Sequence, residues 1–521
     1  MKKSRILSLL GLFLLITSCK DDIDELFLNP DGSTSTKIEY LFTAATIEPM
    51  AGLRIGYNPS GYYLILQGLA PWTQLTGNDA NDANMMNLVS NGVENSWNNY
   101  YRSFMSKVAE MKIVYDDLPE EEQRDYDVYM HLINIVSANG TAKITDLYGD
   151  IPYSEAFMAR SSDNSNLFPK FDSQQEVYTT ILQDLKEAVS FLKSFSLNDS
   201  SAHTALSTQD IVNGGDIDKW IKFANSLRLR LAMRISDGDE TLAQSTVADV
   251  MTSPGDLVLT NADNIYVDAA SPNGLNTRDG SAGNFIARAF NDRETRTFAP
   301  RLMVELMNDA DDPRRPYYFS TNDNGDYVGV PSSPAEITPI QQDILDANYS
   351  KINPEMVLDN LYLPGIVITA SEVNFLLAEA AMKSWIGGSA QVYYETALRE
   401  SVEFYFDMVA INPDVTPMIP DSNEVDNFIS SSSFAFDGSI EQLATQKWIH
   451  LGVLQANEAY SEYRRFDYPV LEENYPEGGG SLLQIPTRVL YPDNEKSFNQ
   501  ANYEAVKASD TPYTKVWWDK N

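Results

Sequence analysis

Apolar residues recur at helical spacing through several long stretches of this chain. From Val93 to Tyr115, the residues of one apolar stripe lie three or four positions apart, as on one face of a helix. Asp172 or Ser173, with Glu176 following, has the form of a helix N-terminal cap. The same spacing predicts further helices at 130–144, 177–192, 217–235, 370–385, 393–409 and 440–451. The chain is therefore expected to be mainly α-helical.

The order of the predicted helices indicates how they are arranged. Several come in adjacent pairs with short connections, which is compatible with a TPR-like array, although no internal repeat with the TPR consensus can be read. Polar stretches at 56–92, 252–299 and 309–365 separate the helices, and loops of this length are usually functional or disordered. Since no linker divides the chain, we expect a single domain at 34–521.

Composition narrows the class of protein. The chain has 74 acidic and 38 basic residues and a formal net charge of −36. Such a surface repels phosphate groups, which argues against nucleic-acid binding. Hydrophobic residues make up 43% and aromatic residues 11% of the chain, as in a globular rather than a disordered protein.

The N-terminus has the build of a secretory signal peptide. Three basic residues within the first five precede the apolar run Ile6–Ile16, which is shorter than the roughly 20 residues needed to span a bilayer. The run ends in Ile-Thr-Ser-Cys, which resembles a bacterial lipobox whose cysteine, here Cys19, is lipidated with acyl chains such as palmitate. Cys19 is the single cysteine of the chain, and lipidation explains its isolation. An ordinary signal peptide with a chance cysteine is the alternative to a lipoprotein signal peptide at 1–18.

An acidic segment follows the cysteine directly. It contains Lys20, Asp21, Asp22, Asp24 and Glu25. One interpretation is a solvated acidic leader, since runs of charged residues are usually exposed to solvent. The other is a sorting signal, because the segment resembles the surface-export signals of outer-membrane lipoproteins in some Gram-negative bacteria. In either case, residues 19–33 are expected to form an acidic, lipidated tether outside the cytoplasm.

Seven stretches occur in the order found in the SusD/RagB family, so the chain resembles that family over essentially its whole length. These are DLYGDIPYSEAF (146–157), FDSQQEVYTTILQDLKEAV (171–189), GDIDKWIKFANSLRLRLAMRIS (215–236), DPRRPYYF (312–319), SEVNFLLAEAA (371–381), ATQKWIHLGVLQANEAYSEYRRFDYP (444–469) and RVLYPDNEKSFNQANYEA (488–505). The family often has Pro-Arg-Arg or Pro-x-Arg before Leu-Tyr-Pro; residues 486–492 read PTRVLYP, so only the second arginine, Arg488, is kept.

The resemblance implies both a fold and a role. It implies a TPR-like superhelix of helix pairs with little β-structure, packed against a loop-rich ligand-binding region. It also implies a lipoprotein on the exterior of the outer membrane that pairs with a SusC-like TonB-dependent transporter. Such a protein covers the transporter barrel as a hinged lid and delivers a captured nutrient, with a glycan favoured over a peptide. Members of the family are not enzymes.

The polar loops contain the candidate ligand residues, since sugars stack on free aromatic rings and bond to neighbouring amides and carboxylates. Trp97, Trp220 and Trp448 lie on apolar stripes and are predicted to be core. The first loop contributes Trp72, Tyr62, Tyr63, Gln74, Asn78, Asp79 and Asn81. The second loop contributes Asn276, Arg278, Asn284 and Phe285. Arg278 could bind the carboxylate of a uronic acid or of a peptide C-terminus.

The sequence gives less support to a metal site or to catalytic residues than to ligand binding. Three dispersed histidines and one cysteine cannot form the usual zinc site, and we expect no cofactor. The segment 320–326 faintly resembles a calcium loop, but such Asn-Asp-Gly clusters are more often turns. A surface glycoside hydrolase acting through a carboxylate pair is the alternative function, because 74 acids always supply some pair. We predict no catalytic residues, since the family resemblance favours binding.

Overall fold

The computed structural model describes residues 36–48, 51, 53, 57–82, 90–158, 167–267, 285–292, 294–431, 433–473, 482 and 484–521. The predicted signal peptide, Cys19 and the acidic segment lie outside the described residues, as do Asn276, Arg278 and Asn284. In the part of the chain that is described, no helix has the length and apolar character needed to cross a membrane.

The helices of the first half of the chain include the longest one, α7. They are α3 (Ile38–Thr46), η2 (Tyr57–Leu69), α4 (Ala70–Trp72), α5 (Ser90–Asn98), η4 (Asn99–Met105), α6 (Ser106–Asp116), α7 (Glu120–Tyr148), α8 (Gln174–Ser194), α9 (Ser201–Gln209), α10 (Ile217–Arg234) and α11 (Glu240–Val250). Both η2 and η4 have wide, π-type turns. The stripe predicted between Val93 and Tyr115 is therefore one nearly continuous helix, with wider turns in its middle.

Shorter helices are frequent in the second half. They are α12 (Phe285–Asn291), α13 (Arg301–Asp309), α14 (Arg315–Tyr318), α15 (Pro334–Ile337), α16 (Gln341–Leu345), α17 (Ala370–Met382), α18 (Ala390–Ala410), α19 (Ser422–Ile429), α20 (Ile440–Leu451), α21 (Ala456–Phe466), α22 (Asp493–Phe498) and α23 (Gln500–Val506). The strands of the described residues form two small antiparallel pairs. One pair is β1 (Ile151–Pro152) with β2 (Phe171–Asp172), and the other is β3 (Ile265–Val267) with β4 (Gly365–Ile368). The expected mainly α fold is confirmed.

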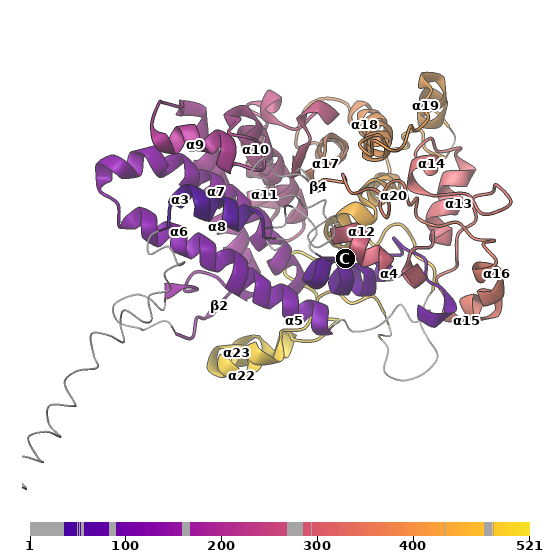
Figure 1. Ribbon diagram of the computed structural model, residues 1–521, viewed down its shortest axis with the longest axis horizontal. Helices are drawn as coiled ribbons and strands as arrows, with labels where there is room; N and C mark the ends of the chain where they lie inside the picture. The colour runs from indigo at the N-terminus through magenta and orange to yellow at the C-terminus, as the bar shows by residue number, and fades with distance from the viewer. Residues whose placement is uncertain are drawn as a thin grey trace, which may run out of the picture.

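Consecutive helices pack as pairs, as expected of a TPR-like array. The pairs are α7 with α8, α10 with α11, α17 with α18, and α20 with α21 (Figure 1). Helix α10 also packs on α8 and α17, and α17 packs on α20, so the pairs form one continuous stack. The short helices α13 to α16 and α19 gather at the opposite end of the molecule from α7 and α8. This loop-rich end is where the candidate site lies.

Local sequence signals account for several helix ends and core positions. The Ser173 side chain accepts a hydrogen bond from the Glu176 backbone, and the Glu176 side chain accepts one from Ser173, which forms a capping box. Helix α7 ends at Gly149, whose φ of 78° suits a residue without a Cβ. Trp97, Trp220 and Trp448 are buried, as their positions on apolar stripes predict.

The segment around 57–72 differs from its sequence interpretation. We expected a polar loop at 56–92, but residues 57–72 are helical and lie within η2 and α4. Leu64, Ile65, Leu66 and Leu69 are buried and supply an apolar face to the core. Glycine, proline and asparagine near Tyr57 conceal this face, because tertiary packing outweighs their low helix propensity.

An ion-pair network joins the helices at the centre of the stack. The Arg230 Nε and Nη2 atoms each lie 2.6 Å from a carboxylate oxygen of Glu372. Arg234 contacts Asp146, and its Nη2 atom lies 2.7 Å from Glu458 Oε2. Further pairs in the network are Arg234–Glu462, Lys447–Glu462, Arg465–Glu379 and Arg465–Glu462. Buried charges require such partners, so α7, α10, α17, α20 and α21 are held in one arrangement.

The network predicts a loss of stability in acid. Burial alone would raise the pKa of Glu458, but the charges of Arg230 and Arg234 outweigh it and lower the pKa from 4.5 to about 2. This contribution, about 3 kcal/mol, is therefore present above pH 4.5 and is lost as the pH falls towards 2. The pKa of Glu462 is also lowered, whereas burial raises that of Asp146, which contributes in the opposite sense.

Denaturant midpoints measured between pH 2 and 7 check this expectation. Glu458→Gln should be less stable than wild type at pH 7, and the difference should shrink as the pH falls below 4.5. Glu187→Gln, on the exposed side of α8, is the control and should follow the wild-type profile. A constant difference between Glu458→Gln and wild type across this range would contradict the role given to Glu458.

Candidate functional site

Most of the described candidate residues in the first loop are buried. Trp72 is 1% exposed, and its ring centroid lies 5.8 Å from that of Tyr460. The Gln74 side chain bonds to the backbone of Glu472 through both its nitrogen and its oxygen, at 2.7 and 3.1 Å. Trp448 Nε1 donates to the Thr73 carbonyl. These contacts connect the turn after α4 to the core.

The remaining candidates are placed as follows. Asn78 and Asp79 are buried, and the Asp79 carboxylate accepts a hydrogen bond from the exposed Asn81. Tyr63 is half-buried, and the side chains of Tyr62 and Phe285 lie outside the described set. The structure therefore places Asn78, Asp79 and Asn81 in one packed turn, whereas Trp72 lies in α4 against Tyr460. Their contact with ligand stays a prediction.

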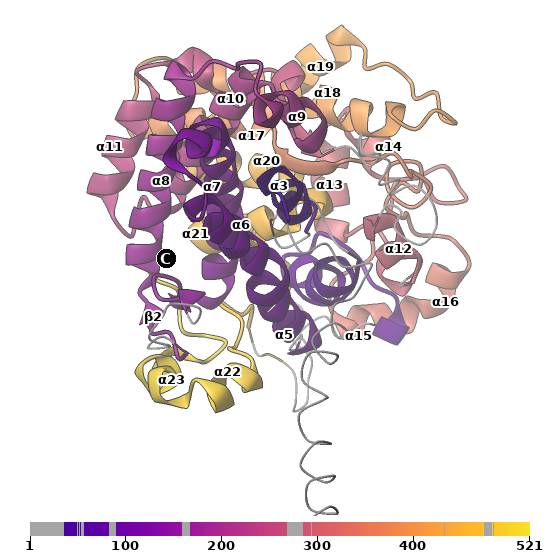
Figure 2. The same cartoon turned by 60° about the vertical axis from the view of Figure 1, so that its left-hand side comes forward.

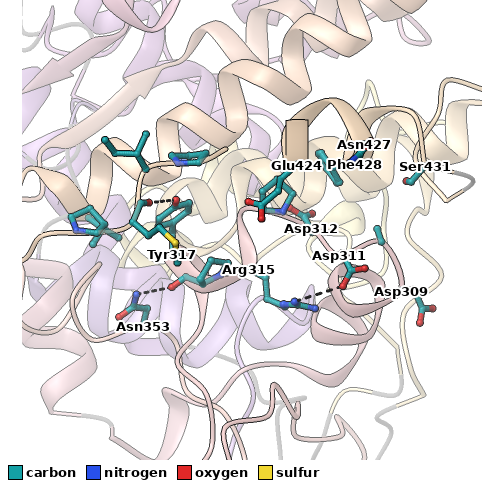
Figure 3. A pocket seen from close by; sticks show the side chains of 18 of the residues that line it. Asp309, Asp311, Asp312, Arg315, Tyr317, Asn353, Glu424, Asn427, Phe428 and Ser431 are labelled. Carbon is teal, nitrogen blue, oxygen red and sulfur yellow. Dashed lines mark hydrogen bonds and ion pairs between the residues drawn. The ribbon is translucent and has the colours of Figure 1, made fainter. Parts of the chain in front are cut away.

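A large open cavity lies elsewhere at the loop-rich end, between α14 and α19. It has a volume of about 830 Å³. Asp309, Asp311, Arg315 and Tyr317 come from the α13–α14 segment, and Figure 3 shows them below Glu424, Asn427, Phe428 and Ser431 of α19 and its following turn. Asn353, Glu355 and the segment 416–420 complete the lining. We call this cavity the α14–α19 pocket.

The buried Arg314 holds in place the turn between α13 and α14, which forms one wall of the pocket. Its guanidinium forms an ion pair with Asp312 at 2.6 Å and also donates to Gln446 and Ser401. Arg314 therefore pairs with a carboxylate two residues before it in the chain. The turn between α13 and α14 is thereby tied to α18 and α20, and the side chains of Arg315 and Tyr317 project from it into the lining.

Helix α19 and the segment before it form the facing wall. Asp421 caps α19 by accepting hydrogen bonds from the backbone nitrogens of Asn423 and Glu424, at 2.8 and 3.3 Å. The Tyr317 hydroxyl donates to the Met418 carbonyl, which connects the two walls. Burial, with a smaller effect of Glu424, raises the pKa of Tyr317 to about 12, so this hydroxyl stays neutral.

The lining of the pocket combines acidic and apolar groups. The lining contains one arginine, Arg315, and the carboxylate of Asp312, which is already paired with Arg314. It contains four further carboxylates, those of Asp309, Asp311, Glu355 and Glu424. Met418 and Ile419 are largely exposed beside Pro417 and Pro420 and provide apolar surface. Carboxylates accept hydrogen bonds from hydroxyl groups, and amides both accept and donate them, while the negative charge of the lining disfavours an anionic ligand. The pocket thus suits a hydroxyl-rich neutral ligand.

Sequence reasoning did not find this pocket. The polar stretch 309–365 is rich in Pro, Asp and Tyr residues, but nothing in it indicates that residues near 420 lie opposite. The apolar pair Met418–Ile419 between two prolines, outside any helical stripe, was an available signal of an exposed apolar surface.

The faint calcium signal at 320–326 is accounted for by a turn. The Asn322 side-chain oxygen accepts hydrogen bonds from the backbone nitrogens of Asn324 and Asp326. Gly325 has a φ of 85°. Within the described ranges, no group of three or more His, Cys, Asp or Glu side chains could hold a metal ion.

Comparison with known proteins identifies the family. Residues 33–492 match the SusD-like family described as "Starch-binding associating with outer membrane". The match covers most of the chain, so this protein belongs to the SusD-like family. No curated protein matches the chain significantly.

Solved structures are similar to this chain over nearly its full length. A chitin-binding protein is 24% identical with a TM-score of 0.74, over 93% of this chain and 100% of that one. A Bacteroidetes AC2a SusD-like protein is 23% identical with a TM-score of 0.73, over 93% and 100%. A SusD homologue from Bacteroides vulgatus is 21% identical with a TM-score of 0.72, over 92% and 98%. At these identities the similarity shows the shared fold.

Proposed function

We propose that this protein is a cell-surface lipoprotein that binds an extracellular glycan and delivers it to a SusC-like TonB-dependent transporter in the outer membrane. The observation that carries the proposal is the family match over residues 33–492. The lipobox at Cys19 and the acidic segment after it support attachment to the membrane and export to the surface. The protein acts as a hinged lid on the transporter, and its role is binding rather than catalysis.

The α14–α19 pocket is the proposed glycan site. It is open, it offers acidic and amide groups to hydroxyls, and its exposed apolar surface suits the C–H face of a sugar. The turn with Asn78, Asp79 and Asn81 packs on Phe298 and Gln341, at the same loop-rich end of the molecule (Figure 1). Of the predicted ligand residues of the first loop, Asn78, Asp79 and Asn81 thus belong to the same end and remain part of the proposal.

Replacing two acids of the pocket should weaken glycan binding. Asp311→Asn and Glu424→Gln should each lower affinity about tenfold, because a hydrogen bond to a charged group contributes about 1.5–3 kcal/mol. Calorimetry with starch-derived and chitin-derived oligosaccharides and with short peptides measures the effect. Asp199→Asn, in an exposed loop outside the pocket, is the matched control and should bind as wild type does.

The panel also separates the competing functions. Binding confined to peptides would contradict the glycan proposal, and equal affinities for all four proteins would remove the α14–α19 pocket from it. Release of shortened products from an oligosaccharide would favour the glycoside hydrolase instead.

A further inference from the structure

A second cavity lies where the C-terminal segment meets α4 and α5, away from the α14–α19 pocket. Helix α22 lies beside α5 (Figures 1 and 2), and Asn494 donates to the Asn98 side chain across this contact. The cavity has a volume of about 230 Å³, several times the roughly 30 Å³ share of one water molecule. It is lined by Trp72, Val93, Glu94, Pro486, Arg488, Val489, Leu490, Tyr491, Pro492, Asp493 and Lys496. We call it the Trp72–Arg488 cavity.

Two buried donors of this cavity have no acceptor. Trp72 Nε1 and Arg488 Nε make no hydrogen bond, although Trp72 is 1% exposed and Arg488 is 3% exposed. A buried donor without an acceptor destabilises the fold, and more so when it is charged. By contrast, the indole nitrogens of Trp220, Trp448 and Trp518 all bond to protein oxygens.

Arg488, like the equally buried Arg464, lacks the ion pair with a carboxylate that other buried arginines of the described chain form. Arg230, Arg234, Arg314 and Arg465 each form an ion pair with a carboxylate. Arg488 instead donates to the Tyr148 carbonyl and lies 5.0 Å from the centre of the Tyr491 ring. No described carboxylate lies within ion-pair distance of Arg488, so its positive charge has no direct partner in this part of the chain.

The charged side chains near the cavity do not neutralise Arg488 by direct contact. Asp150 accepts a hydrogen bond from the Gln174 backbone, and Arg488 acts on it only at longer range. Asp493 has a 97% exposed side chain, so solvent screens its charge, and Lys496 pairs with Asp493 and Asp510. Glu94 also lines the cavity but is exposed, so solvent screens its charge as well. The interior of the cavity therefore combines one cationic donor and one neutral donor with apolar walls.

We infer that the Trp72–Arg488 cavity binds the carboxylate of a compact ligand with an apolar face, such as a uronic acid residue of a glycan. Arg488 and Trp72 donate to the carboxylate oxygens, and Val93, Pro486 and Val489 contact the body of the ligand. A peptide C-terminus presents the same group. The inference does not depend on the proposed function, because it rests on a different cavity with the opposite preference for charge.

Titration calorimetry tests the inference on the soluble mature domain and on its variants. The probes are glucuronic acid against glucose, and the dipeptide Ala-Ala against its C-terminal amide. Wild type should bind glucuronic acid at least about tenfold more tightly than glucose, because a charge-assisted bond is lost with the neutral sugar. Preference for Ala-Ala over both glucuronic acid and the amide would instead assign the cavity to peptides.

Conservative variants separate binding from folding. Arg488→Met should abolish the preference for the carboxylate, Arg488→Lys should keep part of it, and Trp72→Phe should lower affinity several-fold while preserving the ring. Trp385→Phe and Arg399→Met, both outside the cavity, are the matched controls and should bind as wild type does.

Two outcomes would overturn the inference. One is equal affinity of wild type for the charged and neutral probes, which would mean that the cavity holds only water. The other is unchanged binding of glucuronic acid by folded Arg488→Lys and Trp72→Phe. Asp311→Asn should leave this binding unaltered, so failure of the α14–α19 pocket and failure of this cavity are distinguishable.

Discussion

Replacing Arg234 by methionine should destabilise the fold by about 3–5 kcal/mol, which is the cost of breaking a buried ion pair by removing one partner. Arg234 is fully enclosed and contacts three carboxylates, those of Asp146, Glu458 and Glu462. Methionine has a similar length, so the variant removes the charge with little change in packing. The three acids then lose the cation that lies between α7, α10 and α21. Urea or guanidinium unfolding followed by circular dichroism measures the loss.

An exposed ion pair supplies the control. Arg399 lies 2.6 Å from Asp426, and both side chains are about half exposed. Arg399→Met should therefore cost less than about 1 kcal/mol, because solvent screens the pair and already solvates both groups. Equal unfolding midpoints for Arg234→Met and Arg399→Met would show that the buried network does not support the fold.

Replacing Cys19 by alanine should remove the protein from the outer-membrane fraction. The acyl chains proposed for this residue, which ends the lipobox, are the proposed attachment to the membrane. The variant should be soluble or unprocessed and should not incorporate labelled palmitate. Wild type from the same membranes should co-purify with a SusC-like barrel, and the variant should not. Membrane retention of Cys19→Ala, or absence of a barrel from the wild-type sample, would contradict the proposal.

A second variant separates attachment from orientation. Neutralising Asp21, Asp22, Asp24 and Glu25 should leave the protein lipidated but facing the periplasm. Neutralising three acids at the start of α7, Glu120 to Glu122, is the matched control and should leave surface exposure unchanged. Normal surface labelling of the first variant would refute the sorting role of the acidic segment.

Helices and their apolar faces could be predicted from the sequence with good accuracy. The stripe through Val93 and Tyr115, the cap at Ser173 and the core positions of Trp97 and Trp220 all depend on neighbours within one or two helical turns. Such contacts are encoded in spacing along the chain. The pairing of Arg314 was predictable for a similar reason, because its partner Asp312 is two residues away.

The candidate sites could not be predicted in this way. The α14–α19 pocket joins Asp311 to Glu424, and the second cavity joins Trp72 to Arg488, so both combine segments far apart in the sequence. Trp72 was expected in an open loop, and it is instead enclosed by the C-terminal segment and Tyr460. Spacing carries no information about which distant segments meet.

The sequence by itself determined the helical class, the family resemblance and the expected lipid attachment at Cys19, because each depends on residues close together in the chain. Only the tertiary structure decided which polar side chains are buried and what they face. Arg230 and Arg234 lie off the apolar stripe of α10, yet carboxylates from α7, α17 and α21 surround them. A charge can be buried only where distant segments bring its partners, so its environment is a property of the whole fold.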